Sequence, residues 1–218
     1  MANAELIDVD HWPRREHFNH YRNRVGCTYS ITVDVDVTEM VAALRGSAKK
    51  TYLAQVWSLA SIVNRHDEFR MTLDETGAPA VWDVMHPGFT VFNPDRETFA
   101  SVWSPFRPDF VAFHDEAADV LRRYKTATSM FPQSDTPANT FDVSSLPWTS
   151  FTGFTLTIRD SWDFLLPIFT IGRYREEAGR TKMPLAVQIH HAAADGFHTS
   201  RFIQDLQDLV AAPGWITS

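Results

Sequence analysis

The sequence predicts a two-layer α/β fold of the α+β type, in which helices cover a mixed β-sheet. Stretches of alternating apolar and polar residues indicate strands, and stretches with apolar residues every three or four positions indicate helices. Helical stretches near both ends and in the middle of the chain, with several strands between them, favour a mixed sheet. The 218 residues, 44% of them hydrophobic, are enough for one core, so we expect a single domain over residues 1–218.

The first part of the chain predicts a helix, a strand and two further helices. A short amphipathic helix is expected over residues 13–21, with Asp10 as its cap. Residues 28–37 alternate and predict a strand with one polar face. Thr38 is expected to cap the next helix, and a more apolar helix is expected over 51–64.

The middle of the chain is punctuated by Gly and Pro and predicts short strands. Those within 69–104 are expected to form an antiparallel meander. A helix follows over 109–125. Residues 126–140 predict a long loop, which is uncommon in compact domains unless it serves a site. A strand is then expected over 151–158.

The end of the chain predicts a hairpin, a polar corner and a final helix. The hairpin strands are expected over 168–174 and 182–190, and the helix over 197–210. The alternation along the second hairpin strand places His191 on its apolar face and His190 on the other, so the two histidines are not expected to act on one atom. A polar corner after an apolar strand is a common place for chemistry.

This corner also has plainer interpretations. A histidine at the end of a buried strand is most often a core residue with its hydrogen bonds satisfied. A metal site made of His190, His191, Asp195 and His198 would have a spacing that matches no zinc signature. Cys27, the one cysteine, is better explained as a core or pocket thiol than as a nucleophile, because no base is predicted beside it.

The composition argues against several classes of partner. A net charge of −7 and a pI near 5.7 disfavour nucleic acid and anionic membranes. No apolar run reaches membrane-spanning length, and the first residues lack a signal-peptide pattern, so we expect a cytoplasmic protein. Sixteen Phe and seven Trp are more than one core needs and indicate, besides the core, an apolar ligand pocket or a subunit interface.

Residues 188–198, QIHHAAADGFH, closely resemble the signature of the trimeric chloramphenicol acetyltransferases, the kind without hexapeptide repeats. A bare HHxxxDG is shared with peptide-synthetase condensation domains and, in shortened form, with dihydrolipoyl acyltransferases. Further motifs make the narrower resemblance specific, and they run in order nearly from end to end: WPRREHF (12–18), DEFRM (67–71), WD (82–83), TVF (90–92), ETF (97–99), SSLPW (144–148) and PIFT (167–170).

The resemblance implies roles for residues at the corner. His191 would be the base that removes a proton from the 3-hydroxyl of chloramphenicol while that oxygen attacks the thioester of acetyl-CoA in a ternary complex. Ser144 would donate to the resulting oxyanion, and Thr170 would contact it through water. Asp195 would form a structural ion pair with Arg14, and a carbonyl contact would set the tautomer of His191.

The resemblance also implies the binding sites. Chloramphenicol would contact seven residues: Tyr21, Cys27, Tyr29, Phe99, Phe131, Leu156 and Ile168. Acetyl-CoA, a co-substrate rather than a bound cofactor, would contact Trp148 and Tyr174, with Lys50 near a phosphate. No metal is expected. The enzyme would be a bacterial homotrimer with its active sites at subunit boundaries, where His191 of one chain faces Tyr21 and Cys27 of the next.

Two positions depart from the family pattern, and two other functions remain open. His20 stands where relatives carry an apolar residue, which bears on substrate fit, and Ala194 replaces a common cysteine without an expected effect on mechanism. One alternative is a CoA-dependent acyltransferase of the same fold that acts on another alcohol or thiol. The other is an inactive trimer that binds amphipathic ligands.

Overall fold

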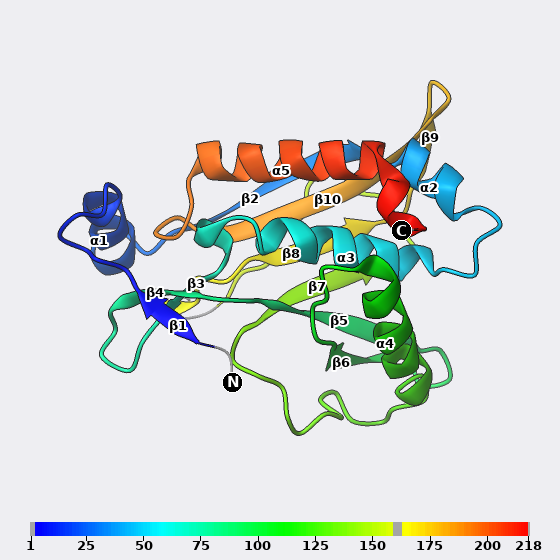
Figure 1. Ribbon diagram of the computed structural model, residues 1–218, viewed down its shortest axis with the longest axis horizontal. Coiled ribbons are helices and arrows are strands. Elements are labelled where there is room, and N and C mark those ends of the chain that lie inside the picture. Colours follow the sequence, from blue (N-terminus) through cyan, green and yellow to red (C-terminus); the bar gives the residue numbers. More distant parts are fainter. Residues whose placement is uncertain (1–2, 159–162, 218) are drawn as a thin grey trace.

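A computed structural model describes residues 3–158 and 163–217 (Figure 1). Its helices are α1 (Arg15–Asn23), α2 (Thr38–Leu44), α3 (Thr51–Val63), α4 (Phe110–Arg123) and α5 (Gly196–Ala211), with 3-10 turns at Asp67–Phe69 and Pro213–Ile216. Its strands are β1 (Ala4–Leu6), β2 (Thr28–Asp36), β3 (Met71–Leu73), β4 (Pro79–Trp82), β5 (His86–Asn93), β6 (Thr98–Trp103), β7 (Thr140–Leu146), β8 (Ile168–Gly172), β9 (Arg175–Glu177) and β10 (Arg180–His190).

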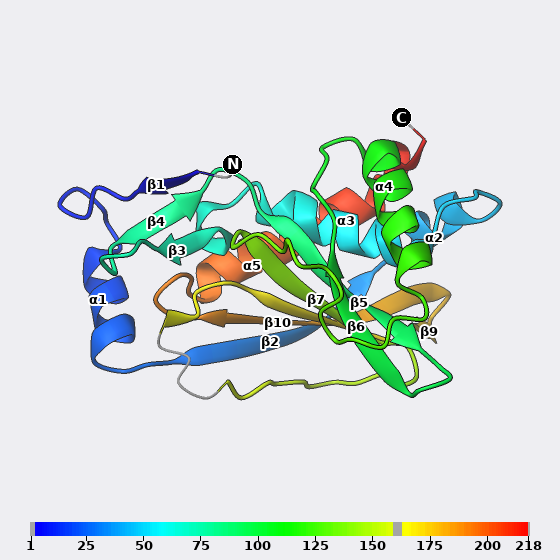
Figure 2. The ribbon, with the colours of Figure 1, turned by 90° about the horizontal axis from the view of Figure 1, so that it is seen from below.

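The large sheet is mixed, as the sequence predicts. Within the described residues its order is β2-β10-β8-β7-β5-β6, and β9 adds to the end of β10. The central strand β7 runs parallel to both β5 and β8, whereas β10 pairs antiparallel with β2 and β8. A small antiparallel sheet, β1-β4-β3, lies to one side (Figures 1 and 2).

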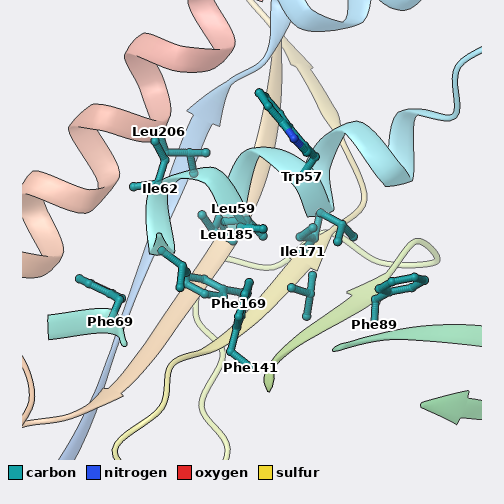
Figure 3. Packing of buried hydrophobic residues seen from close by; sticks show 14 of the residues in the cluster. Trp57, Leu59, Ile62, Phe69, Phe89, Phe141, Phe169, Ile171, Leu185 and Leu206 are labelled. Atoms are coloured by element: carbon teal, nitrogen blue, oxygen red, sulfur yellow. The ribbon is translucent and has the colours of Figure 1, made fainter. Parts of the chain in front are cut away.

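Helices α3, α4 and α5 lie on the same side of the large sheet (Figures 1 and 2), so the molecule has two layers. Helix α3 is the centre of the helical layer, because nearly all of its side chains are buried. Leu59 of α3 belongs to the same cluster of buried hydrophobic residues as Leu185 of β10 and Ile171 of β8 (Figure 3). Fully burying one such side chain stabilises the fold by about 1.5–3 kcal/mol, so α3 fixes the position of the central strands. None of the helices in the described residues has the length and apolarity needed to cross a membrane.

The register of the sheet decides which side chains share a face. Ser144 of β7 lies opposite Thr170 of β8, and Thr170 lies opposite Ala186 of β10. Gln188 and His190 follow Ala186 at alternate positions and share its face, because side chains alternate along a strand. The face away from the helical layer is therefore the one that carries these polar groups.

The predicted meander is wrong as a single unit. Its first hairpin, β3 and β4, pairs with β1 in the small sheet, and only β5 and β6 join the large one. The turn between β3 and β4 is held by the carboxylate of Asp74, which accepts from the N–H groups of Thr76 and Ala78 at 2.8 Å each. Such a turn specifies a hairpin but not the sheet that the hairpin joins.

The strand predicted over 151–158 is also wrong. This segment forms no strand, and its backbone groups bond to side chains of the sheet instead. The carbonyl of Phe154 accepts from Ser30 Oγ at 2.7 Å, and the N–H of Leu156 donates to Gln188 Oε1 at 2.8 Å. The alternation in this segment thus reflects an extended chain that bonds to side chains of the sheet, rather than a strand with backbone hydrogen bonds to a neighbouring strand. The strand that the sequence pattern missed here is β7.

Two of the predicted helix caps are wrong, and one that was not predicted is present. Asp10 does not cap α1, whose cap residue is Arg14, and Thr38 is the first residue of α2 rather than its cap. Asp109 caps α4 by accepting from the N–H of Ala112 at 2.7 Å. The loop predicted after α4 is present, since no helix or strand occurs between α4 and β7.

Candidate active site

The corner between β10 and α5 is fixed by the start of the helix. Asp195 is the N-cap of α5, and its Oδ1 accepts from the N–H of Phe197 at 3.1 Å. The N–H of Asp195 in turn donates to Nδ1 of His198 at 3.2 Å, which completes a capping box. Ala192, Ala193 and Ala194 between strand and helix are fully buried. This corner therefore holds the residue before the alanines, His191, in one place.

The ring of His191 lies against two tyrosines. It stacks on Tyr21 of α1 with 3.8 Å between ring centroids and 9° between planes, and meets Tyr29 edge-on at 5.2 Å. The N–H of His191 donates to the carbonyl of Cys27 at 2.8 Å. Tyr21 and Cys27 thus reach His191 within one chain, which corrects the expectation that they come from the next subunit.

The tautomer of His191 is not set as expected. Its Nδ1 is buried and has no hydrogen-bond partner in residues 3–158 and 163–217, so the predicted carbonyl contact is not made there. Stacking on Tyr21 orients the ring instead. Both tyrosines have polar neighbours: His20 packs edge-on against Tyr21 at 5.0 Å, and the hydroxyl of Tyr29 lies 2.6 Å from that of Thr199. Burial, the main cause, raises the pKa of Tyr29.

The predicted ion pair between Arg14 and Asp195 is present, with 2.5 Å between Nη1 and Oδ2. The Arg14 side chain is only 13% exposed, and its other amino group lies 3.4 Å from the carbonyl oxygens of His191 and Ala192. Burial raises the pKa of Asp195, but the Arg14 hydrogen bond and the charges of His198 and Arg14 outweigh it and leave the pKa below its usual value. Arg14 therefore joins α1 to the backbone that carries His191.

The sequence did not predict that this network extends further. Nδ1 of His198 lies 2.8 Å from Oδ1 of Asp195, and Nε2 lies 3.3 Å from Glu68, which also pairs with Arg201 at 3.0 Å. The position of His198 could have predicted its contact with Asp195, because a side chain three residues after an N-cap can bond back to the cap residue. Asp195 is consequently held from both sides.

His190 has a different setting, as the alternation predicts. It is almost fully buried, and its Nδ1 accepts from the N–H of Ala192 at 3.1 Å. Burial is the main cause that lowers the pKa of His190, and the nearby positive charges of Arg22 and His191 lower it further. In the described part of the chain no group of three His, Cys, Asp or Glu side chains has an arrangement that could hold a metal ion.

A second group of predicted residues lines a cavity of about 790 Å³ where β7 and β8 end. Ser144, Phe99, Trp148 and Tyr174 all border it. The indole of Trp148, which is 58% exposed, meets Phe92 edge-on at 4.8 Å. Most of the lining is apolar. Sequence reasoning missed several lining residues, namely Tyr52, Gln55, Phe92 and Arg173.

The two serines of the SSLPW motif differ in orientation. Ser144 lies opposite Thr170 and Ser145 lies opposite Ile171, so their side chains point to opposite faces of the sheet. Thr170 is almost fully buried. Both serines border the cavity, because it surrounds the end of β7. Only Ser144 shares a face with Thr170, as the sequence predicts for adjacent residues of an extended segment.

Within one chain the corner and this cavity are far apart. His191 follows Ala186 by five residues along β10, and Ala186 is in register with Thr170 and, through it, with Ser144. At about 3.3 Å per residue and 4.8 Å per strand, His191 and Ser144 are roughly 20 Å apart. The structure therefore brings Arg14, Tyr21 and Asp195 to His191, but not Ser144 or Thr170.

The remaining predicted residues lie outside both groups. Phe131, which is 66% exposed, borders a cavity of about 370 Å³ together with Trp103 and Asp142. Ile168 is buried in β8, and Leu156 is half-exposed on the segment that crosses the sheet. Lys50 precedes α3 with its side chain exposed, and its N–H donates to Nε2 of His114 at 3.0 Å.

Comparison with known proteins agrees with this architecture. The family model described as chloramphenicol acetyltransferase matches residues 2–207. A chloramphenicol acetyltransferase of Streptomyces acrimycini is 64% identical over 210 residues, which cover 96% of each chain. One of Campylobacter coli is 43% identical over 204 residues, 94% of this chain and 97% of its own. A solved chloramphenicol acetyltransferase superposes with a TM-score of 0.84 at 24% identity, covering 95% of this chain and 100% of its own. The chain belongs to the chloramphenicol acetyltransferase family.

Proposed function

We propose that this protein inactivates chloramphenicol by moving the acetyl group of acetyl-CoA to the 3-hydroxyl of the antibiotic. Family membership supports the overall reaction. The observation that supports this chemistry is the position of the His191 ring. The ring stacks on Tyr21, at a corner that the Arg14–Asp195 ion pair holds in place. An imidazole held in this way can accept a proton from a hydroxyl that is placed beside it.

The reaction needs no covalent enzyme intermediate. His191 takes the proton of the 3-hydroxyl while the oxygen attacks the thioester carbon, so a C–O bond forms and the carbonyl oxygen becomes an oxyanion. Ser144 donates a hydrogen bond to that oxyanion, and Thr170 stabilises it through water. The C–S bond then breaks, and the thiolate of CoA leaves with the proton that His191 returns. Both substrates must be bound together throughout.

The two substrates occupy different surfaces in this proposal. Acetyl-CoA lies in the cavity bordered by Trp148 and Tyr174, where Arg173 and the nearby Lys50 supply positive charge for its phosphates. Chloramphenicol lies on the other side of Ser144, against the residues that the family resemblance assigns to it, of which Phe99 also borders the coenzyme cavity. An aromatic ring and a dichloroacetyl group suit such a largely apolar lining.

The separation of His191 from Ser144 favours a shared active site. A separation of roughly 20 Å exceeds the reach of one tetrahedral intermediate, whose donor and base must both lie within about 3 Å of it. A homotrimer in which each site combines His191 of one chain with Ser144 of the next brings them together. The same-chain contacts of Tyr21 and Cys27 are retained in this arrangement.

One assay tests the reaction itself. Release of CoA thiol from acetyl-CoA should depend on chloramphenicol and should be insensitive to EDTA, because no metal takes part in the proposed steps. Equal release without the antibiotic would support another acceptor or simple hydrolysis. The absence of any release, in protein that still binds CoA, would support a ligand-binding protein instead.

Mixing two inactive variants should restore activity if the site is shared between chains. His191→Ala retains Ser144, and Ser144→Ala retains His191, so only mixed trimers can combine the two intact residues. If equal amounts of the two variants assemble at random, about a quarter of the sites contain both an intact His191 and an intact Ser144. Activity should therefore return to about a quarter of that of the parent. The variants should be mixed by co-refolding, with unmixed samples refolded in parallel. An activity equal to the mean of the two variants would contradict the shared site.

A further inference from the structure

A partly buried hydrogen bond connects helix α3 to the wall of the large cavity. Nε2 of Gln55 donates to the hydroxyl of Tyr174 at 2.6 Å. Both residues border the cavity, and Gln55 is only 8% exposed. The bond is partly buried, and breaking it leaves the buried Gln55 amide without this partner.

Gln55 is an unusual residue for its position. Its neighbours along α3 from Leu53 to Val63 are buried, and most are apolar. A buried polar side chain in such a helix requires a partner, because burial without a hydrogen bond is costly. Tyr174 provides that partner from a segment 119 residues away in the sequence.

The orientation of the Gln55 amide follows from a second contact. The same nitrogen lies 3.5 Å from the sulfur of Met183. A thioether sulfur can only accept, so the group that faces it is the NH₂ and not the carbonyl oxygen. The Tyr174 oxygen is therefore an acceptor in this bond. Burial also raises the pKa of Tyr174, which keeps it a neutral phenol.

The ring of Tyr174 depends on this bond for its position. Tyr174 lies between the last residue of β8 and the first of β9, so no ladder hydrogen bond of either strand fixes it. Its hydroxyl is tied to α3, the most deeply buried helix. Removing the tie leaves the backbone in place but allows the ring to change rotamer.

We propose that Gln55 is a positioning residue for the coenzyme, which anchors the Tyr174 ring as a wall of the acetyl-CoA cavity. This rests on the proposed function, because it takes the cavity to be the coenzyme site. Gln55 acts through Tyr174 and does not touch the reacting atoms. It affects binding of the thioester substrate and leaves the acetyl transfer step unchanged.

The test is steady-state kinetics on Gln55→Met, which keeps the volume of the side chain but removes the donor. The KM for acetyl-CoA should rise about 3- to 10-fold, the effect of losing one buried neutral hydrogen bond, while kcat and the KM for chloramphenicol stay within about two-fold. Gln55→Glu should restore most of the affinity, because its oxygen can accept from the Tyr174 hydroxyl. Ser58→Ala, one turn further along the same helix and outside the cavity lining, is the matched control.

A double-mutant cycle tests the link through Tyr174. Tyr174→Phe removes the hydroxyl and should give the same rise in KM, and adding Gln55→Met to it should change the KM by less than about two-fold. Additive effects, or a KM for acetyl-CoA that Gln55→Met leaves unchanged, would overturn the proposal. Tyr174→Phe alone decides the matter if Gln55→Met does not fold, since an unchanged KM would also overturn it. A parent enzyme without chloramphenicol-dependent release would instead refute the proposed function.

Discussion

His191→Ala is expected to lower kcat by about 10⁴-fold, the upper end of the range for a positioned general base. This corresponds to about 5 kcal/mol of transition-state stabilisation. The effect should be large because the ring of His191 is held by stacking on Tyr21, and no other histidine within residues 3–158 and 163–217 stacks on that ring in the same way. The KM for chloramphenicol should change far less than kcat, since in the proposed mechanism His191 accepts the proton only in the transition state.

The control for this variant is the neighbouring histidine. His190→Asn keeps an acceptor where Nδ1 of His190 meets the N–H of Ala192. It should lower the thermal midpoint more than it lowers kcat, because His190 is buried among structural contacts. Added imidazole should recover part of the activity of His191→Ala by filling the space beside Tyr21. A kcat above 1% of the parent in folded His191→Ala would show that another group is the base.

The elements predicted best from the sequence are those with a strong local signal. The alternation of β10 and the apolar repeat of α3 predicted both elements, since each element buries its face against the same core. The final helix followed for the same reason. Such patterns record how a segment meets the core, which is a local property of its side chains.

Pairing between distant strands could not be predicted in this way. β7 was missed because its two neighbours, β5 and β8, are both parallel to it and are far from it in sequence. Residues 151–158 were mistaken for a strand because their pattern also fits an extended chain that bonds to side chains of β2 and β10. Hydrogen bonding across a sheet depends on which segments meet, and the sequence of one segment does not specify its neighbour.

In the candidate site, too, some features could be predicted from the sequence and others could not. The ion pair of Arg14 with Asp195 followed from the family resemblance and is present in the structure. The distance between His191 and Ser144 within one chain could not be predicted, because it depends on the register of β10 against β8. Gln55 gave one local signal, a polar residue among apolar neighbours, but its partner Tyr174 could be identified only in three dimensions.

Ser144→Ala is expected to lower kcat by about 10²- to 10³-fold with a nearly unchanged KM, because in the proposed mechanism Ser144 stabilises an oxyanion that forms only after attack. Ser145→Ala is expected to stay within a few-fold of the parent. The register supports this distinction, since Ser144 shares a face with Thr170 whereas Ser145 lies opposite Ile171. Both serines border the same cavity, so any general effect of losing a hydroxyl there should appear in both variants. Steady-state kinetics on the two variants, with acetyl-CoA and chloramphenicol varied in turn, provide the measurement. An unchanged kcat in Ser144→Ala would show that Ser144 is not the oxyanion donor. A large loss of kcat in folded Ser145→Ala would place the oxyanion on the helical side of β7, and the substrates would then have to approach the sheet from that side.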